Sequence, residues 1–224
     1  MQKTFFVTGI STEIGKTIAA AIIAEALEAD FWKPIQSGHL HHTDSDRIRA
    51  YVSNNQTVIH PEAFKLTKSI SPFAAAKIDD VKIRVKDFKL PKTKNNLIIE
   101  GTGGLLVPLN KKECVIDLIQ AFAIPVILVS MNYTGSVNHT LLSIEALKSR
   151  KIPIAGIIFN GKPTPKSEEM ILRMTEVPLL GNIPRLHDIT KVTIKKEAEK
   201  LARNIQLRNK AKGKGKKLLS LFSF

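Results

Sequence analysis

The stretch Phe5-Phe6-Val7-Thr8-Gly9-Ile10-Ser11-Thr12-Glu13-Ile14-Gly15-Lys16-Thr17 decides the fold, because it predicts a strand, a phosphate-binding loop and the start of a helix. The apolar run before Gly9 is typical of a buried strand, and Gly15-Lys16-Thr17 opens an alanine-rich segment long enough for a helix. In such a P-loop, backbone N–H groups and the helix N-terminus face phosphate. The lysine meets the β- and γ-phosphates and the hydroxyl reaches Mg²⁺.

The spacing of this loop is a variant of the usual one. Gly9 and Gly15 enclose five residues instead of four, and Ile10 occupies the position of the usual first glycine. An ordinary glycine turn before a helix is the alternative interpretation. The strand before the loop and the helix after it favour a nucleotide-phosphate site.

Composition indicates one α/β domain over residues 1–207. The chain has 224 residues, of which 43% are hydrophobic, enough for a sizeable core. No apolar run reaches the roughly 18 residues of a membrane span, and the N-terminus enters a strand without a signal-peptide pattern. The single cysteine, Cys114, excludes an intramolecular disulfide and Cys-based metal sites. We therefore expect a cytoplasmic protein with no membrane partner.

The net charge of +14 is concentrated toward the C-terminus. Residues 208–224 carry six of the positive charges and no acid, which leaves +8 on the rest of the chain. We expect this segment to be a basic, disordered tail, although contact with anionic lipid or nucleic acid is an alternative. A body of charge +8 suits a protein that binds ATP and carboxylates, and it requires no nucleic acid.

Short apolar runs alternate with helical patterns along the whole body of the chain. The pattern predicts strands at 4–8, 31–35, 97–100, 125–129, 153–159 and 177–181 and helices at 15–29, 46–52, 72–77, 115–123, 137–149, 167–175 and 190–205. Residues 53–71 and 79–96 show little regular pattern. Alternation of this kind predicts an α/β fold, P-loop NTPase-like, with a mostly parallel sheet and helices on both faces.

Polar residues gather where the predicted strands end, and such ends share one edge of a parallel sheet. Lys33 is a candidate positive charge in the resulting cleft, and its alternative is to extend into solvent. Glu100, followed by Gly101-Thr102-Gly103-Gly104, is a candidate Mg²⁺ ligand together with Thr17. Asp46 or Asp44 is the second carboxylate, and the spacing leaves the choice open. These groups suit phosphoryl transfer, in which positioning and charge neutralisation dominate.

Several of these segments together resemble the dethiobiotin synthetase family. Its Gly-Thr-x-Thr-x-x-Gly-Lys-Thr loop is similar to residues 9–17, its Lys-Pro-x-x-Ser-Gly segment to residues 33–38, and its Glu-Gly-x-Gly-Gly-x-x-x-Pro-Leu segment to residues 100–109. The resemblance covers residues 1 to about 205 and leaves out the tail. Ile10 stands where the family usually has threonine.

The resemblance implies an ATP- and Mg²⁺-dependent cyclo-ligase of biotin synthesis, which closes the ureido ring of dethiobiotin from 7,8-diaminononanoate and CO₂ or bicarbonate. A carbamate would attack the γ-phosphate, and a second amine would close the ring. By resemblance the catalytic residues are Lys16, Lys33, Thr12 and Ser37, and the metal ligands are Thr17, Asp46 and Glu100. The nucleotide would be bound by Gly9, Glu13, Ile14, Gly15, Lys16, Thr17, Ile18, Asn160 and Pro184, and the substrate by Thr12, Lys33, Ser37 and Asn138. The family is homodimeric, and Asn138 is the position that would reach the partner's substrate.

A different class of protein uses a similar loop, namely ATP-driven switches and partitioning ATPases that bind a membrane or nucleic acid. Those proteins usually carry a signature lysine early in the loop. In this chain Ile10 and Ser11 occupy that region, and no loop lysine precedes Lys16. We therefore favour the ligase interpretation.

Overall fold

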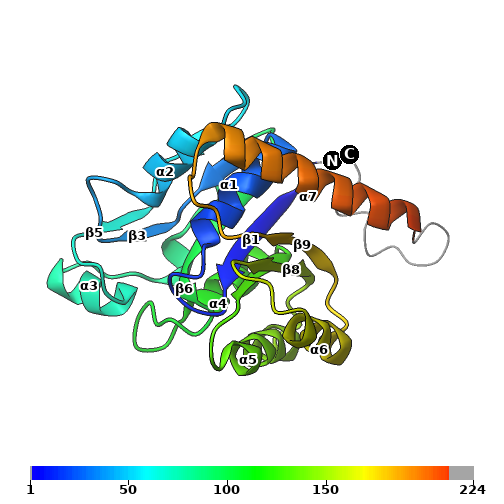
Figure 1. Ribbon diagram of the computed structural model, residues 1–224. Helices are drawn as coiled ribbons and strands as arrows, with labels where there is room; N and C mark the ends of the chain where they lie inside the picture. The colour runs from blue at the N-terminus through cyan, green and yellow to red at the C-terminus, as the bar shows by residue number, and fades with distance from the viewer. Residues whose placement is uncertain (1, 212–224) are drawn as a thin grey trace.

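A seven-stranded parallel sheet forms the centre of the computed structural model, which describes residues 2–211 (Figure 1). Its strand order is β4-β2-β6-β1-β7-β8-β9, and every neighbouring pair runs parallel. The strands are β1 (Thr4–Gly9), β2 (Asp30–Trp32), β4 (Ile59–His60), β6 (Leu97–Gly104), β7 (Val126–Met131), β8 (Ile154–Asn160) and β9 (Leu179–Ile183). The predicted parallel α/β architecture is therefore confirmed.

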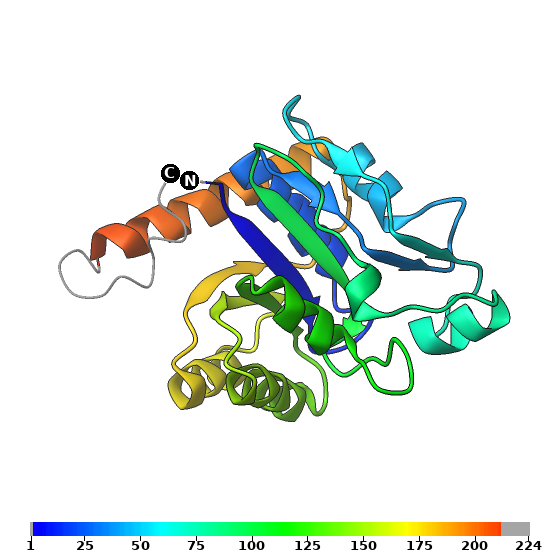
Figure 2. The ribbon, with the colours of Figure 1, turned by 180° about the vertical axis from the view of Figure 1, so that it is seen from behind.

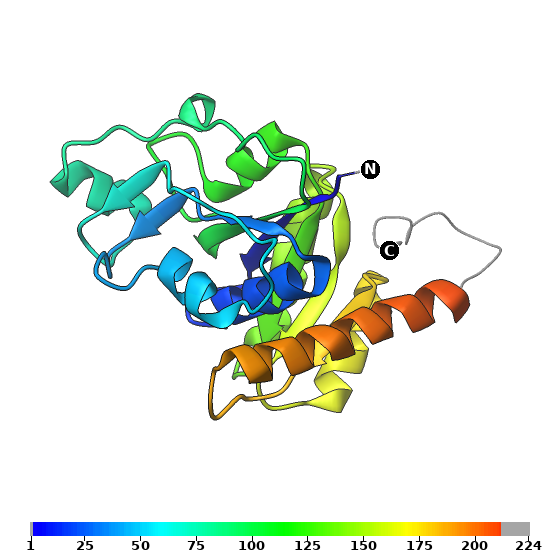
Figure 3. The same cartoon turned by 90° about the horizontal axis from the view of Figure 1, so that it is seen from above.

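Helices cover both faces of this sheet, as the predicted alternation requires (Figures 2 and 3). The helices are α1 (Lys16–Leu27), α2 (Asp44–Tyr51), α3 (Pro72–Ile78), α4 (Val115–Phe122), α5 (Ser136–Ser149), α6 (Pro165–Thr175) and α7 (Lys191–Ala211), with a 3₁₀ turn η1 (Val85–Asp87). Helices α1 and α7 pack side by side on one face, and α4 and α5 lie on the other (Figure 3).

Strand β1 is buried on both faces, which explains its continuous apolar sequence. Phe5 and Val7 belong to the hydrophobic cluster shared with α1 and α7, whereas Phe6 points into the cluster shared with α4. Small side chains let α1 approach the sheet closely, since Ala19, Ala20 and Ala21 are fully buried. This packing fixes the start of α1 directly above the end of β1.

The predicted strand at 31–35 is two strands, which corrects the sequence interpretation. β2 ends at Trp32, and β3 (Ile35–Ser37) leaves the main sheet and pairs with β5 (Phe64–Leu66) in a separate two-stranded parallel sheet. Pro34 lacks an N–H and cannot continue a ladder, so the chain changes direction there. The segment 53–71, predicted to be irregular, therefore supplies β4 and β5.

Helix α7 runs to Ala211, past the predicted helix end at 205 and the predicted boundary at 207. The rest of the predicted tail, residues 212–224, lies outside the described residues. Between residues 2 and 211 no helix is both long enough and apolar enough to cross a membrane.

Candidate active site at the P-loop

The loop between β1 and α1 turns through a glycine that no other residue replaces easily. Gly15 has φ of +83°, and a Cβ at this position would lie 2.1 Å from Nδ2 of Asn160. That Nδ2 donates a hydrogen bond of 2.9 Å to the carbonyl oxygen of Ile14. The end of β8 therefore supports the loop from behind, at the point where the chain enters α1.

Lys16 lies in the first turn of α1 and is largely buried. Its Nζ donates to the carbonyl oxygen of Ser11 at 2.8 Å, so the side chain folds back over the loop. Burial, together with the nearby charge of Lys33, lowers the pKa of Lys16 to about 8. An anion bound in the loop would favour the charged form of this lysine.

Lys33, Glu100 and Asp44 form a charged cluster beside the loop. Lys33 Nζ lies 2.8 Å from Glu100 Oε1 and 2.7 Å from Asp44 Oδ2, and both Lys33 and Glu100 are at most 4% exposed. Burial opposes the charge of Lys33, yet the two carboxylates outweigh it and raise the pKa of Lys33. The lysine therefore stays protonated between two acids. Thr17 joins the cluster, because its hydroxyl donates to Glu100 Oε1 at 2.9 Å.

The start of α2 decides which aspartate faces this cluster. Thr43 caps the helix, with its backbone N–H donating to Asp46 Oδ2 at 3.0 Å and its hydroxyl accepting from the Asp46 N–H at 3.1 Å. Asp46 is also paired with Arg49 and is 42% exposed. Asp44 points to Lys33 instead, and the pKa of its carboxyl is held down by Lys33 although burial opposes the charge. Asp46, predicted as a metal ligand, therefore lies away from the cluster.

A cleft of about 750 Å³ opens over the P-loop and this cluster. Most of the predicted site residues line it: Thr12, Glu13, Gly15, Lys16, Thr17, Ile18, Lys33, Ser37 and Glu100. Segments separated by more than 80 residues in sequence thus meet in one cavity, as the common edge of the strands predicted. Ser37 Oγ is buried and has no hydrogen-bond partner among the described residues, so it is available to a bound molecule.

The other predicted residues lie outside the lining of this cleft: Gly9, Ile14, Asp46, Asn138, Asn160 and Pro184. Gly9 and Ile14 pack closely, because a Cβ on Gly9 would meet the Ile14 side chain at 2.6 Å and Ile14 is 1% exposed, and their predicted role in nucleotide binding stays a prediction. Pro184 is exposed just after β9, and Asn138 is exposed in the first turn of α5.

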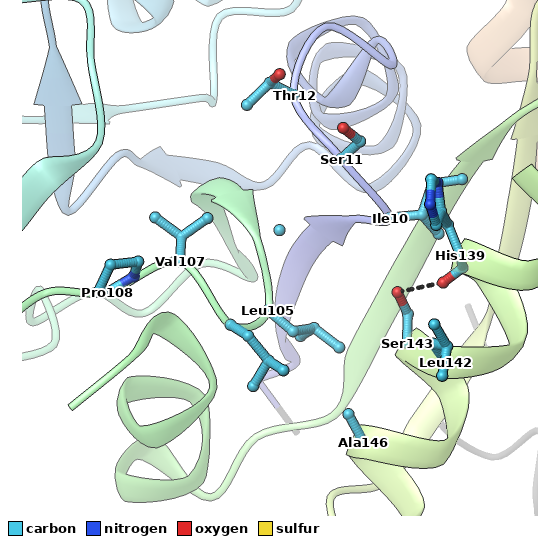
Figure 4. A pocket seen from close by; sticks show the side chains of 12 residues that line it. Ile10, Ser11, Thr12, Leu105, Val107, Pro108, His139, Leu142, Ser143 and Ala146 are labelled. Carbon is cyan, nitrogen blue, oxygen red and sulfur yellow. Dashed lines mark hydrogen bonds between the residues drawn. The ribbon is translucent and has the colours of Figure 1, made fainter. Parts of the chain in front are cut away.

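A second, apolar pocket of about 430 Å³ adjoins the cleft through Thr12 (Figure 4). The figure shows the loop residues Ile10 to Thr12 along the top, α5 at the lower right, and Leu105 facing both from the other side. The lining is Ile10, Ser11, Thr12, Gly104, Leu105, Leu106, Val107, Pro108, His139, Leu142, Ser143 and Ala146. Leu106 and Leu142 are 64% and 59% exposed, which leaves the mouth of the pocket apolar.

The donor set of the charged cluster fits Mg²⁺, which prefers one or two carboxylates and completes its shell with phosphate and water oxygens. Glu100 Oε2 is buried and accepts no hydrogen bond within residues 2–211. Burial raises the pKa of this carboxyl, which a cation would offset. The same residues contain no group of three or more His, Cys, Asp or Glu arranged to hold a metal alone.

Comparison with known proteins decides the family. Residues 3–193 match a family model described as an AAA domain. The ATP-dependent dethiobiotin synthetase BioD of Christiangramia forsetii is 48% identical over 205 residues, which cover 92% of this chain and 99% of the relative. The protein of the same name from Cytophaga hutchinsonii is 47% identical, over 91% of this chain and 98% of the relative. The chain belongs to the dethiobiotin synthetase family.

Solved structures similar to this member of the dethiobiotin synthetase family come from the wider P-loop class. The septum site-determining protein MinD of Pyrococcus horikoshii OT3, in complex with Mg-ADP, has a TM-score of 0.61 and 18% identity over 96% of this chain and all of that chain. A ParA family ATPase from Chlorobium tepidum has a TM-score of 0.52 and 15% identity, over 88% of this chain and 98% of that chain. At these identities the likeness establishes the fold alone.

Sequence reasoning missed several polar residues that line this dethiobiotin synthetase cleft, among them Arg47 and Gln36. Arg47 lines it and lies 3.5 Å from Asp44, and the spacing of three residues on one helix face is the signal for that pair. Gln36 is buried, accepts from the Asp44 N–H at 3.2 Å and donates to the Gly38 carbonyl at 2.9 Å. Both partners of Gln36 lie within eight residues of it, but they meet only because the chain between β3 and α2 turns back on itself.

Proposed function

We propose that this chain closes the ureido ring of dethiobiotin from 7,8-diaminononanoate and CO₂, at the expense of MgATP. The observation that carries the proposal is the match to ATP-dependent dethiobiotin synthetases along 98% and 99% of their length. The cleft supports it, because it combines a P-loop with two lysines and the two carboxylates that pair with Lys33.

In the proposed reaction, one substrate amine adds to CO₂ and loses a proton, giving a carbamate. A carbamate oxygen attacks the γ-phosphorus of ATP, the bond to the ADP oxygen breaks, and a carbamic–phosphoric anhydride results. The second amine then attacks the carbamyl carbon, the carbon–oxygen bond to phosphate breaks, and ring closure releases phosphate and a proton. The net products are dethiobiotin, ADP and phosphate.

The lysines supply fixed positive charge for this transfer between anions. Lys16 binds the β- and γ-phosphates in this proposal, because its side chain lies over the P-loop. Lys33 faces the carbamate side and neutralises charge there, because its ammonium is buried and kept protonated by Glu100 and Asp44. Preorganised charge of this kind is usually the largest contribution to catalysis. Thr12, Glu13 and Ser37 line the space between phosphate and substrate.

Thr17, Glu100 and Asp44 would hold Mg²⁺. The ion neutralises phosphate charge when it is bound with the nucleotide. Asp44 replaces Asp46 in this assignment, because Asp44 lines the cleft and Asp46 caps a helix. We propose further that Asn160 and Pro184 flank the nucleotide base, since Asn160 ends β8 and contacts the P-loop at Ile14, and Pro184 follows β9, which pairs with β8.

We also propose that the protein is a homodimer in which α5 contributes to the interface. Leu106 and Leu142 are exposed at the mouth of the apolar pocket, and a partner subunit that covers them would remove apolar surface from water. Asn138 is exposed on the same helix and lines neither cavity of its own chain, so it is free to reach a substrate held by the partner.

Phosphate release from MgATP, measured with and without 7,8-diaminononanoate and bicarbonate, tests the proposed function. We expect release to require both additions and to yield a product with the mass of dethiobiotin. Lys16→Ala should abolish it, whereas Lys3→Ala, outside the cleft, is the matched control. Release that is indifferent to the diamine, with no dethiobiotin formed, would overturn the proposal.

A further inference from the structure

Glu168 is a buried carboxylate outside the cleft that the proposed chemistry does not use. It lies in the first turn of α6 and is 7% exposed. Its Oε1 accepts from Asn132 Nδ2 and from the backbone N–H of Thr164, and its Oε2 accepts from Asn182 Nδ2, each at 2.8 Å. All three donors are neutral amides. A buried carboxylate is costly without such donors, so this arrangement is built around the charge.

The three donors come from three segments at the carboxyl edge of the sheet. Asn132 follows β7, Thr164 ends the loop after β8, and Asn182 lies near the end of β9. A single side chain thus joins the ends of three neighbouring strands. Loops at such an edge have few other long-range restraints, so Glu168 is well placed to fix their mutual positions.

One further hydrogen bond extends this network, and a separate backbone bond joins the ends of β8 and β9 beside it. Asn132 Nδ2 also donates to the Lys162 carbonyl at 3.1 Å, and the Gly161 N–H donates to the Ile183 carbonyl at 2.8 Å. Gly161 directly follows Asn160, and Ile183 directly precedes Pro184. Through Asn132 and Thr164, Glu168 therefore fixes the loop that begins directly after Asn160, and through Asn182 it fixes the residue two positions before Pro184.

We infer that Glu168 is a positioning residue for nucleotide binding, which ties the loop after Asn160 to the segment before Pro184. This inference rests on the proposed function for the role of those two residues. Glu168 acts through Asn132, Thr164 and Asn182 and not by contact with the cleft, whose lining does not include it. Its charge matters because a carboxylate accepts on both oxygens, whereas a glutamine offers one acceptor and one donor.

The affinity for MgADP, measured by calorimetry, tests the inference without requiring ring closure. Glu168→Gln should weaken MgADP binding about tenfold, since a hydrogen bond to a charged group is lost and a buried donor is left unsatisfied. Asn182→Ala removes only the Oε2 partner at an exposed position and should weaken binding about threefold. Glu169→Gln is the matched control, because it makes the same charge change on an exposed neighbour.

Steady-state kinetics separate positioning from general loss of structure. In Glu168→Gln the KM for ATP should rise by the same factor as the MgADP dissociation constant, with kcat and the KM for the diamine retained. MgADP affinity within about twofold of wild type in both Glu168→Gln and Asn182→Ala would overturn the inference. So would a fall in kcat at unchanged KM for ATP. If no dethiobiotin forms, the proposed function fails while the MgADP titration still decides the role of Glu168.

Discussion

Replacing Lys33 with methionine removes the cation that lies between Glu100 and Asp44 while keeping an unbranched side chain of similar length. Glu100 is 1% exposed and Asp44 is 18% exposed, so neither carboxylate recovers its full hydration when the ammonium is lost. Breaking a buried ion pair by removing one partner costs about 3–5 kcal/mol of unfolding free energy. We expect a value in this range, because two acids lose one shared partner.

Differential scanning calorimetry without nucleotide or Mg²⁺ measures this loss. For a chain of this size each kcal/mol lowers Tm by about 2–4 °C, so Lys33→Met should unfold roughly 6–20 °C below the wild type. Lys82→Met is the matched control, because Lys82 is exposed and the substitution is the same. Its Tm should change by less than about 2 °C.

The pH dependence of the loss has a definite sign. Burial already raises the pKa of Glu100, and removal of Lys33 raises it further because that ammonium is the main group that lowers it. A carboxyl with a folded-state pKa above its unfolded value binds its proton more tightly when folded, so it regains stability as pH falls through that pKa. The Tm deficit of Lys33→Met should therefore shrink as the pH falls through the raised pKa of Glu100.

Added Mg²⁺ should also reduce the Tm deficit of Lys33→Met. The ion neutralises the two carboxylates, so it should raise the Tm of Lys33→Met more than that of the wild type. A Tm deficit below about 2 °C would refute the reasoning, because the cluster would then contribute nothing to stability. An equal deficit at acidic and alkaline pH would also refute it, since the excess charge would not reside on Glu100.

Three further outcomes follow from the site. Lys16 has a pKa of about 8 in the free protein, and bound phosphate favours its protonated form. The affinity for ADP should therefore fall as the pH rises above about 8, by at most tenfold per pH unit. Calorimetry should show that ADP binding takes up a proton in this pH range. The decline should be absent in Lys16→Arg, and a decline of equal slope there would exclude Lys16 as the titrating group. Asp44→Asn should raise the Mg²⁺ concentration needed for half-maximal turnover about tenfold or more, whereas Asp46→Asn should leave it within about twofold and lower Tm by a few degrees through loss of the helix cap; a reversed order would return the metal role to Asp46. Leu142→Lys should convert the proposed homodimer to a monomer in light scattering, because a lysine replaces an apolar residue on a face that we expect to be covered; a wild-type chain that is already monomeric would contradict the proposed interface.

The charged cluster illustrates why some of the site was not predictable. Lys33 and Glu100 are separated by 67 positions, and their contact depends on β2 lying next to β6. Both residues were candidates because Glu100 ends a predicted strand and Lys33 lies near the end of another. The strand register and the crossover connections decide which side chains come into contact, and local sequence propensity encodes neither of them.

The choice between Asp44 and Asp46 had a local signal that the first interpretation did not use. Thr43 and Asp46 have the spacing of a capping box, which occupies the Asp46 carboxylate with the helix N-terminus. Asp44 is then the carboxylate free to face the cleft. Its 2.7 Å contact with Lys33, however, follows only from the packing of α2 against the end of the sheet.

The sequence by itself determined the P-loop, the parallel α/β class and the candidates Lys16, Lys33 and Glu100, which line the cleft. Those features follow from short-range patterns, since the apolar runs, glycines and helix starts act within a few residues. Tertiary structure alone decided the small sheet of β3 and β5, the partners of Lys33 and the network of Glu168. Each of these features depends on segments that are distant in the sequence and lie side by side only in the folded chain. For Lys33 and Glu168, burial then requires a partner, because an unpaired charge inside the protein is costly.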